Sequence, residues 1–471
     1  MLKKLLAVAI GKSVLSLLRF LNRSATAFPG KLALRILPDL IQCLLDSSNL
    51  KTVYISGTNG KSTTSSMIKS ILQTSKMTVV CNDSGANLLT GIATSLLESS
   101  SWLGRLAADV VVLEVDEATL PKMILHFDPD IIIITNFFAD QLDRFGEVEK
   151  TVHIVHRALK MSCAKICLNA DDPYSAGLAS ELSSANDQIF YGIEPIPQGA
   201  ELECECAERH YCALCGESLI YRYRTYAHIG KYECPQCSFS RPSPDACARV
   251  LNIGTDHSGI EFSFSDKLPQ CLQDTDLLTQ IRLPGVYNIY NAVASASAAA
   301  LLEVAPDFID RGLSEFEGVF GRWEKFYIEG VQLEITLVKN PVGLNQVMRS
   351  VQRREGAKVM FLALNDKAAD GRDISWIWDV NFEETTLIEC SDVHFVVAGT
   401  RADDLAVRLK YAGLDEHRLT VESDLVKALD ACCRKSQQED AVIYSLPNYS
   451  AMWKLRREIL RRVEIEEAAG V

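Results

Sequence analysis

The sequence predicts an α/β protein with more than one domain: a central, mostly parallel sheet that carries a small cysteine-rich insertion, followed by a second α/β domain. Three observations support this. The chain has 471 residues, more than one compact core holds at the usual ~100–200 residues per domain. Apolar runs alternate with helix-like stretches in two separate series. Between them lies a segment rich in cysteine and tyrosine. A content of 48% hydrophobic and 23% charged residues is typical of folded proteins.

Residues 1–49 form the first predicted unit, an amphipathic helical segment. Its start, MLKKLLAVAIGKSVLSLLRFLNR, has the basic pair and apolar run of a secretory signal, but Gly11, Lys12 and Ser13 interrupt the run. No uninterrupted apolar span of ~20 residues results. The helix either docks on the rest of the protein or lies on a membrane surface with cationic flanks, and the sequence leaves both interpretations open.

Residues 50–320 form the predicted central domain. Helices are expected at 62–74, near 90–97 and at about 288–302. Strands are expected within the runs TVYISG, MTVVCN, DVVVLEV, DIIIITN and KICLN. Runs this apolar indicate strands that are covered on both faces, as in a parallel sheet flanked by helices. This arrangement is typical of nucleotide-binding α/β domains.

A phosphate-binding loop is predicted where the first of these strands ends, in KTVYISGTNGKSTTSS. It has the short form G-x-x-G-K-S, because Ile55 stands where a full Walker motif has its first glycine. Backbone amides and the helix N-terminus would hold phosphate there. Lys61 would reach the terminal phosphates, and the Ser62 hydroxyl would join a Mg²⁺ shell.

Acidic and amide side chains follow two of the neighbouring predicted strands. Glu114 and Glu117 follow one, and Asn136, Asp140 and Asp143 follow the other. Since ligands bind at the carboxyl ends of parallel strands, these groups are expected beside the phosphate loop, where carboxylates would complete the magnesium site.

A zinc ribbon is predicted in the insertion at about residues 201–244. Two C-x-x-C pairs, Cys212 with Cys215 and Cys234 with Cys237, are separated by 18 intervening residues. Four thiolates on two turns suit a structural, tetrahedral Zn²⁺ site. A redox pair is the alternative. We interpret Cys204, Cys206 and Cys247 as spare thiols. Fifteen cysteines arranged in this way fit a reducing compartment, so we expect a cytoplasmic protein.

A zinc ribbon also raises the hypothesis of an ATPase that acts on nucleic acid. The tract RYRTYAHIGKY interleaves basic and aromatic residues, as surfaces that bind single strands do. However, the net charge is −13, and helicase-type motifs are missing. We therefore expect no nucleic-acid partner.

Residues 321–471 form the predicted C-terminal α/β domain. Strands are expected within QLEITLVK, KVMFLALN, VHFVVAG and AVIYSL, with helices near 344–353 and over 403–412. No internal repeat of fixed period is apparent.

Six motifs occur in an order that resembles the Mur ligase family: GTNGKST, LEVDEATL, TNFFADQLDRFG, NADDP, YNIYNAVASA and GRWEKF. They span residues 51–326. Members of that family use ATP to convert a carboxylate into an acyl phosphate, which an amine then attacks to form an amide. The resemblance implies ATP and Mg²⁺ as cofactors, with Glu114 as the magnesium carboxylate. It also assigns nucleotide contacts to Gly57, Thr58, Asn59, Gly60, Lys61, Ser62, Thr63, Asn288, Asn291 and Arg322.

Two positions depart from the pattern of the peptide-adding Mur ligases. Asp140-Gln141 stands where they usually carry Asp-His, and His156 stands where many carry a carbamylated lysine. These departures argue against an enzyme that adds an amino acid, such as a muramyl or folylpolyglutamate ligase, which remains the alternative enzyme class.

The cysteine ribbon together with LVKNPVGLNQV and LNDKAADGRDISWIWD resembles one branch, the MurT family. Its members are synthetase subunits that amidate the D-glutamate of the lipid II stem peptide to D-isoglutamine. Their partner is a glutaminase, GatD, which supplies ammonia. The resemblance therefore implies lipid II as the substrate, a site of action at the inner face of the membrane, and a heterodimer. A membrane-surface role of the N-terminal helix would suit such a substrate.

In that family an aspartate of the C-terminal domain completes the catalytic triad of the glutaminase. Four candidates follow the predicted strand KVMFLALN: Asp366, Asp370, Asp373 and Asp379. At most one or two can be catalytic, and the sequence does not select among them. Lys339 and Asn340 are expected to face the nucleotide when the domains close, although a structural turn explains that pair nearly as well. Trp376 and Trp378 belong either to the core or to a partner surface.

Overall fold

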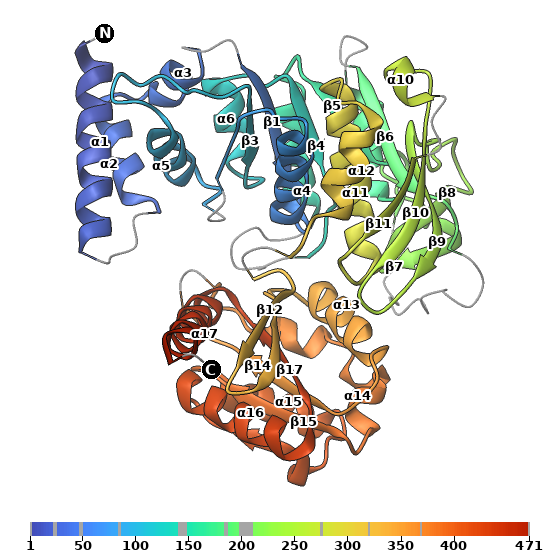
Figure 1. Ribbon diagram of the computed structural model, residues 1–471. Coiled ribbons are helices and arrows are strands. Elements are labelled where there is room, and N and C mark those ends of the chain that lie inside the picture. Colours follow the sequence, from blue (N-terminus) through green and yellow to red (C-terminus); the bar gives the residue numbers. More distant parts are fainter. Residues whose placement is uncertain are drawn as a thin grey trace.

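Two sheets, one above the other in Figure 1, form the body of the computed structural model. The structure describes residues 2–21, 26–46, 50–82, 86–139, 148–182, 187–196, 211–273, 277–318, 321–367 and 370–469. Asp140, Gln141, Asp143, Cys204 and Cys206 lie outside these ranges, as do residues 201–210 of the predicted ribbon.

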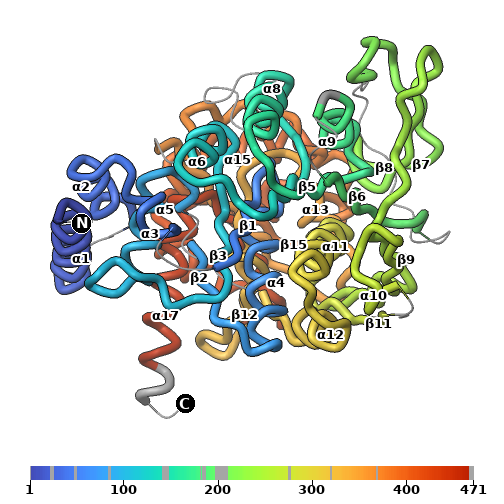
Figure 2. The backbone as a smooth tube through the Cα atoms, turned by 90° about the horizontal axis from the view of Figure 1, so that it is seen from above, coloured from blue at the N-terminus to red at the C-terminus, as the bar shows by residue number. Residues whose placement is uncertain are grey.

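Three helices precede the first strand and pack at one end of the molecule (Figures 1 and 2). They are α1 (Leu2–Phe20), α2 (Phe28–Ile36) and α3 (Leu40–Leu45). Ala33 of α2 and Leu97 of α5 (Leu89–Ser99) lie so close to Gly11 that a Cβ there would stand 3.3 Å and 2.7 Å from their side chains. The small residue lets α1 pack closely against both neighbours. Within the described ranges, no helix is both long enough and apolar enough to cross a bilayer.

The central sheet has nine strands in the order β11-β10-β9-β6-β5-β4-β1-β3-β2. All neighbours from β2 to β9 pair in parallel, and β9, β10 and β11 pair antiparallel. The parallel strands β1 to β5 were predicted, but β6, β9 and the antiparallel extension were not. The strands are β1 (Lys51–Ser56), β2 (Val79–Cys81), β3 (Val110–Glu114), β4 (Ile131–Ile134), β5 (Lys165–Asn169), β6 (Gln188–Ile193), β9 (Ala246–Ile253), β10 (Ser258–Phe264) and β11 (Leu277–Ile281).

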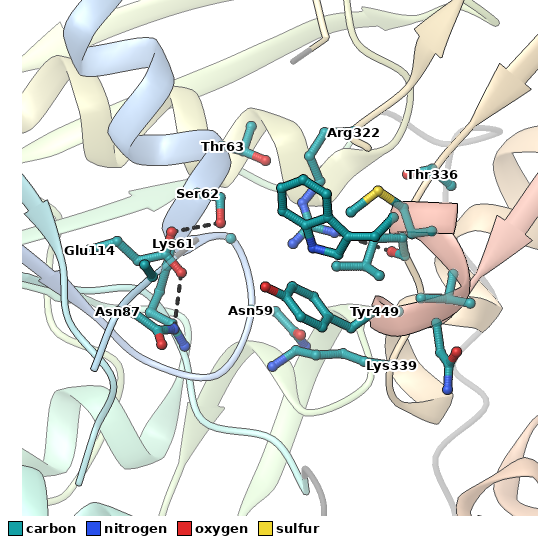
Figure 3. A pocket seen from close by; sticks show the side chains of 18 of the residues that line it. Asn59, Lys61, Ser62, Thr63, Asn87, Glu114, Arg322, Thr336, Lys339 and Tyr449 are labelled. Atoms are coloured by element: carbon teal, nitrogen blue, oxygen red, sulfur yellow. Dashed lines mark hydrogen bonds between the residues drawn. The ribbon is translucent and has the colours of Figure 1, made fainter. Parts of the chain in front are cut away.

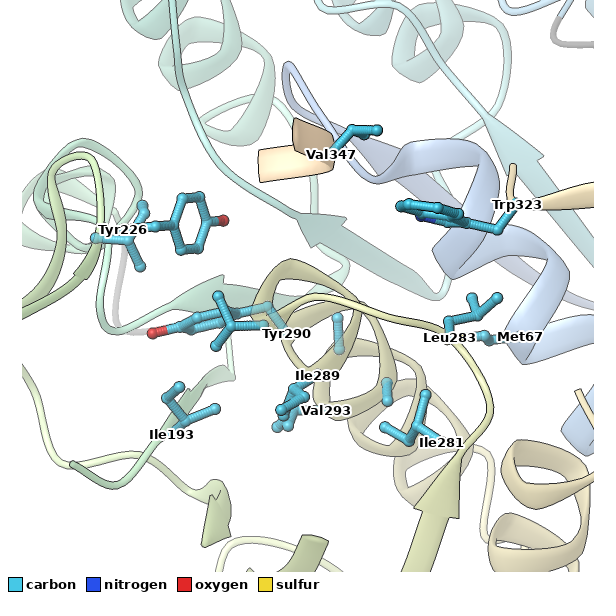
Figure 4. Packing of buried hydrophobic residues seen from close by; sticks show 14 of the residues in the cluster. Met67, Ile193, Tyr226, Ile281, Leu283, Ile289, Tyr290, Val293, Trp323 and Val347 are labelled. Carbon is cyan, nitrogen blue, oxygen red and sulfur yellow. The ribbon is translucent and has the colours of Figure 1, made fainter. Parts of the chain in front are cut away.

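Helices cover both faces of this sheet, so successive strand residues enter two different cores. Val53 and Ile55 join the cluster under α4 (Lys61–Thr74), α11 (Val286–Leu301) and α12 (Pro306–Ser314), whereas Tyr54 joins the opposite one. Figure 4 shows Ile289 and Val293 of α11 in the first cluster. The opposite face carries α5, α6 (Leu120–His126) and α8 (Val148–Leu159). Burial on both faces explains why the strand sequences are apolar throughout.

The cysteine-rich insertion is a hairpin of β7 (Ile220–Tyr226) and β8 (Ile229–Glu233), with one knuckle before β7 and the other after β8. A small core of its own, which includes Leu219, Tyr232 and Phe239, packs on α9 (Pro173–Gly177). The Tyr232 hydroxyl donates to the carbonyl of Ala170 at 3.1 Å. Two further short elements of this domain are the 3₁₀ helix η1 (Leu178–Glu181) and α10 (Gln270–Gln273).

The second sheet has six strands in the order β12-β13-β17-β14-β15-β16, parallel except for the β12–β13 hairpin. They are β12 (Glu324–Ile328), β13 (Val331–Ile335), β14 (Lys358–Ala363), β15 (Val393–Ala398), β16 (Leu419–Val421) and β17 (Val442–Pro447). One face is covered by α16 (Leu425–Glu439) and α17 (Tyr449–Ala469), and the other by α13 (Pro341–Gln352), α15 (Ala402–Tyr411) and η2 (Ser375–Asp379). The remaining elements are η3 (Phe382–Glu384), α14 (Thr386–Glu389) and η4 (Glu416–Arg418).

Candidate active site

A cleft of about 2050 Å³ lies where the two sheets meet. The phosphate loop and α11 line one wall, and residues 336–347 and the start of α17 line the other. This volume exceeds the ~300–1,000 Å³ typical of a site for one small molecule. The cleft therefore has room for a nucleotide together with a second, larger substrate.

The phosphate loop joins β1 to α4 and turns at two glycines with positive φ. Gly57 and Gly60 have φ values of 118° and 87°. A Cβ at residue 60 would stand 2.2 Å from Oδ1 of Asn291, so only glycine lets the loop approach α11 this closely. The loop is also tied to the end of β4. Thr58 N–H donates to the Asn136 carbonyl at 2.8 Å, and Asn59 N–H donates to Asn136 Oδ1 at 3.0 Å.

Lys61, the first residue of α4, is buried and paired. Its ammonium donates to Glu117 Oε1 at 2.8 Å and also to the Gly57 carbonyl. Both partners of this ion pair are more than nine-tenths buried. Burial works against the charged amine, but the carboxylates of Glu117 and Glu114 outweigh it and raise the Lys61 pKa. A phosphate bound in the loop would compete with Glu117 for this ammonium.

Ser62 and Glu114 come together at the end of β3 (Figure 3). The Ser62 hydroxyl donates to Glu114 Oε2 at 2.7 Å, and Asn87 Nδ2 donates to the other oxygen, Oε1, at 3.2 Å. The Glu114 backbone is held by Asn82, which accepts from its N–H and donates to its carbonyl, both at 2.8 Å. A hydroxyl and a carboxylate side by side next to a phosphate loop are ligands of the hard-oxygen type that Mg²⁺ takes. The residues thus fit the predicted magnesium site.

The remaining residues predicted to contact nucleotide line the same cleft. On α11, Asn291 Nδ2 donates to Asn288 Oδ1 at 3.1 Å. Arg322 donates to the Leu337 carbonyl at 3.2 Å. Burial lowers the pKa of Arg322, although Glu114 opposes this shift. From the C-terminal side, Asn340 Nδ2 donates to Asn59 Oδ1 at 3.0 Å, and Lys339 lies beside it in the cleft (Figure 3). The structure therefore gathers these residues, and their contacts with a nucleotide remain predictions.

The four candidate aspartates occupy different surroundings. Asp370 is buried, lines the cleft, and accepts from the N–H and the hydroxyl of Ser450 at 2.7 Å and 2.6 Å. Asp366 accepts from the Thr400 hydroxyl at 2.8 Å and is partly exposed. Asp373 accepts from Ser375 N–H, and hydrogen bonds from Ser375 lower its pKa. Asp379 is exposed at the end of η2.

The four cysteines of the predicted zinc site form one cluster, with their sulfur atoms within 4.8 Å of one another. Leu214 N–H donates to the sulfur of Cys212 and Gln236 N–H to that of Cys234, each at 3.4 Å. Donation from the backbone to the first cysteine of each knuckle stabilises thiolates, so the donor set suits a tetrahedral metal with sulfur ligands. Cys247 lies on β9, outside this cluster.

Several polar residues of the site were not predicted from the sequence. Asn87 lines the cleft and Asn82 holds the Glu114 backbone, and both follow β2, a strand of only three residues. Tyr449, Trp453 and Arg457 line the cleft from the start of α17. The position after a strand end was the available signal for the two asparagines. For α17 there was none, since its place depends on the packing of the second sheet.

Comparison with known proteins agrees with this architecture. The family model of the Mur ligase middle domain matches residues 55–213, and that of the MurT ligase C-terminal region matches residues 337–452. A curated relative, the MurT subunit of lipid II isoglutaminyl synthase (glutamine-hydrolyzing) from Staphylococcus aureus (strain COL), is 32% identical over 460 residues. The alignment covers 97% of this chain and 98% of the relative.

The chain belongs to the MurT family. The predicted Mur ligase fold is confirmed, and it is also the fold of structures with much lower identity. A pseudomurein peptide ligase type C from Methanothermus fervidus is 21% identical, with a TM-score of 0.63 over 92% of this chain and 84% of the other. MurF from Thermotoga maritima, solved in complex with ADP, is 15% identical, with a TM-score of 0.59 over 92% and 85%.

Proposed function

We propose that this chain is the synthetase subunit of a lipid II isoglutaminyl synthase. It converts the α-carboxylate of D-glutamate in the lipid II stem peptide to the amide of D-isoglutamine, with ATP and ammonia. The likeness to a relative of that name over nearly the whole of both chains supports the substrate. The observation that carries the chemistry is the phosphate loop, with Ser62 paired to Glu114, in a cleft shared with the C-terminal domain.

The proposed reaction has two steps. A carboxylate oxygen of the substrate attacks the terminal phosphorus of ATP, ADP leaves, and an acyl phosphate forms. The nitrogen of ammonia then attacks the carbonyl carbon, inorganic phosphate leaves, and a proton is released. Lys61 and Arg322 place positive charge at the cleft wall, where it stabilises the charge that develops on phosphate oxygens. Ser62 and Glu114 would hold Mg²⁺, which offsets phosphate charge when bound.

The units predicted at residues 1–49, 50–320 and 321–471 are, in this proposal, an N-terminal helical unit, an ATP-binding domain and a partner-binding domain. Zn²⁺ in the four-cysteine cluster has a structural role, since all four positions are protein sulfur. In this proposal the reaction takes place in the cytoplasm at the inner face of the membrane, because the substrate is a lipid and the reaction consumes ATP.

Amide formation with a free amino acid is the competing activity, and one experiment separates the two. The purified chain is mixed with lipid II, ATP and Mg²⁺, and with either ammonium chloride or a set of amino acids. We expect the mass of the muropeptide to change by conversion of one carboxylate to a carboxamide in the sample with ammonium chloride, and no change in the sample with amino acids. Incorporation of an amino acid in place of ammonia, or release of phosphate without any new amide, would refute the proposal.

A GatD-type glutaminase is the proposed partner, and an exposed aromatic patch near η2 fits its docking. Trp378 and Tyr411 are 51% and 76% exposed and pack edge to face, with ring centroids 5.6 Å apart. Exposed aromatic pairs are typical of binding hot spots. We expect Tyr411→Ala to weaken partner binding and glutamine-dependent turnover, with ammonium-dependent turnover unchanged. Tyr327→Ala is the control, because that residue is 68% exposed on β12.

The aspartate that completes the glutaminase triad is testable in the same assay. Asp370 is the poorest candidate, since both its carboxylate oxygens are bound by Ser450. Asp366, Asp370, Asp373 and Asp379 are each changed to Asn with the glutaminase present. One change should abolish use of glutamine while use of ammonium persists, because only the partner's histidine depends on that carboxylate. If every variant loses both activities together, or none loses either, the triad proposal fails.

A further inference from the structure

The outward side of α1 is largely apolar, although its large side chains belong to none of the core clusters of the described residues. Ala7, Val8, Gly11 and Leu15 are buried and form the side that packs inward. The opposite side carries Leu2, Leu6, Ala9, Ser13, Leu17 and Phe20, at intervals of three and four residues along the helix. We call these six residues the outer face of α1.

Large side chains of this outer face are unusually exposed. Leu2, Leu6, Leu17 and Phe20 have exposed fractions of 82%, 51%, 56% and 86%. Single exposed apolar residues are normal, but four on one face of one helix form a patch of the kind that marks an interaction surface. In Figures 1 and 2, α1 stands at the outermost edge of the molecule, beyond α2 and α5. The close packing at Gly11 already fixes the helix to its neighbours, so the outer face is not needed for folding.

The charge around this helix differs from that of the rest of the protein. Residues 1–38 contain seven lysines and arginines and no aspartate or glutamate, in a chain whose net charge is −13. Lys3 of α1 and Lys31 and Arg35 of α2 are exposed. A helix with apolar residues on one side, cationic flanks and no acid is the type that lies in the interface of an anionic bilayer.

The carboxyl end of α1 lies at the mouth of the cleft. Arg19, Thr26 and Ala27 line the cleft together with the phosphate loop. A surface that binds the outer face of α1 therefore lies close to the entrance of the active-site cleft.

We propose that the outer face of α1 docks on an anionic lipid bilayer and that this docking presents the cleft to a lipid-anchored substrate. The second half of the proposal rests on the proposed function, and the first half does not. The polyprenyl chain of the substrate stays in the bilayer, while its stem peptide enters the cleft past the end of α1. The docked helix lies along the surface, with its outer face toward the lipid.

The test measures flotation of the full chain with vesicles, without ATP or substrate, so that its result does not depend on catalysis. One set of vesicles contains equal parts of phosphatidylglycerol and phosphatidylcholine, and the other contains phosphatidylcholine only. We expect binding to the anionic vesicles and much weaker binding to the neutral ones. Leu17→Ser with Phe20→Ser should lower the partition into anionic vesicles at least ~tenfold, since each lost side chain removes apolar surface worth about that factor.

The matched control is Leu125→Ser with Leu278→Ser, two leucines that are 73% and 58% exposed on α6 and β11. It should bind vesicles as the wild type does. Thermal unfolding of both double variants should match the wild type, because the changed side chains are exposed. Equal vesicle binding by both double variants would overturn the proposal. The proposal would also be overturned if Leu17→Ser with Phe20→Ser kept vesicle binding but lost self-association or glutaminase binding. That result would assign the outer face of α1 to a protein partner.

Discussion

Gly60 and Gly356 have nearly the same backbone angle in different surroundings, and together they separate two costs of a side chain. Their φ values are 87° and 85°, both left-handed. At Gly356 no heavy atom lies within 4 Å of an added Cβ, whereas at Gly60 the Asn291 side chain would be 2.2 Å away. Gly356 therefore requires only a residue that tolerates a left-handed backbone, whereas Gly60 also requires a residue without a side chain.

We predict that Gly356→Ala lowers the free energy of unfolding by about 1–2 kcal/mol, the usual cost of a left-handed residue. Gly60→Ala should lower it further and should also abolish ATP binding, because the loop has to move away from α11. Chemical denaturation and nucleotide titration measure the two effects. Normal ATP affinity in Gly60→Ala would show that the close approach to Asn291 has no functional role.

The sequence was sufficient to predict where Lys61 and Ser62 stand, since a strand, a glycine loop and a helix start fix their position. It could not predict that Lys61 pairs with Glu117, because both residues follow strand ends and several acids were equally placed. Contacts of this kind depend on side-chain rotamers in a packed site, and the local sequence pattern does not determine those rotamers.

At the scale of elements, the four-cysteine ribbon shows how a small insertion is attached to a large domain. Its knuckles cannot bury enough apolar surface to be stable alone, since its own core has only a few residues. Anchors to the main domain are provided by Tyr232 and by Arg241, which pairs with the buried Asp171. Tyr290 of α11 donates to the same carboxylate at 2.6 Å.

Removal of the proposed zinc should therefore loosen the ribbon first. We predict that Cys234→Ser abolishes stoichiometric zinc content and increases hydrogen exchange in residues 211–241, because two sulfur-bearing turns lose their common ligand. Metal analysis and exchange mass spectrometry provide the readouts. Cys247→Ser is the control and should retain zinc. A zinc-loaded Cys234→Ser with unchanged exchange would rule out this cluster as the metal site.

Elements with a uniform pattern were predictable, and elements without one were not. The uniformly apolar runs VVVLE and IIII predicted buried strands, and both are buried strands. In contrast, LLTQI forms β11, in which buried and exposed residues alternate. Its antiparallel pairing with β10 depends on tertiary contacts that the local sequence does not show. The N-terminal helix was predicted, but not the way in which α2 and α5 hold it.

At the scale of the whole molecule, one amide joins the two sheets across the cleft. Asn340 accepts from Gly343 N–H at 2.8 Å and so caps α13, while its Nδ2 donates to Asn59 of the phosphate loop. A single side chain thus stabilises a helix in one domain and contacts the nucleotide loop of the other. The sequence suggested that Asn340 faces the nucleotide, but only the assembled fold identifies its partner.

Replacing Asn340 with serine or alanine separates these two roles. Serine still caps α13, but it is too short to reach Asn59, whereas alanine loses both contacts. We predict that Asn340→Ser retains the thermal stability of the wild type and raises KM for ATP. Asn340→Ala should also lose about 0.5–2 kcal/mol of stability, the usual value of a cap. An unchanged KM in both variants would mean that the amide bridge does not contribute to nucleotide binding.

Because Lys61 is paired with Glu117, a measured nucleotide affinity does not report the attraction between Lys61 and phosphate alone. The arriving phosphate does not meet a bare cation, because the ammonium already has a buried acidic neighbour. Binding is an exchange of one anion for another, so the affinity reports the difference between two strong attractions rather than the full strength of either. A weak measured affinity for nucleotide is therefore compatible with a strong attraction between the Lys61 ammonium and the phosphate. The same exchange of anions makes bound ADP easy to displace after the reaction.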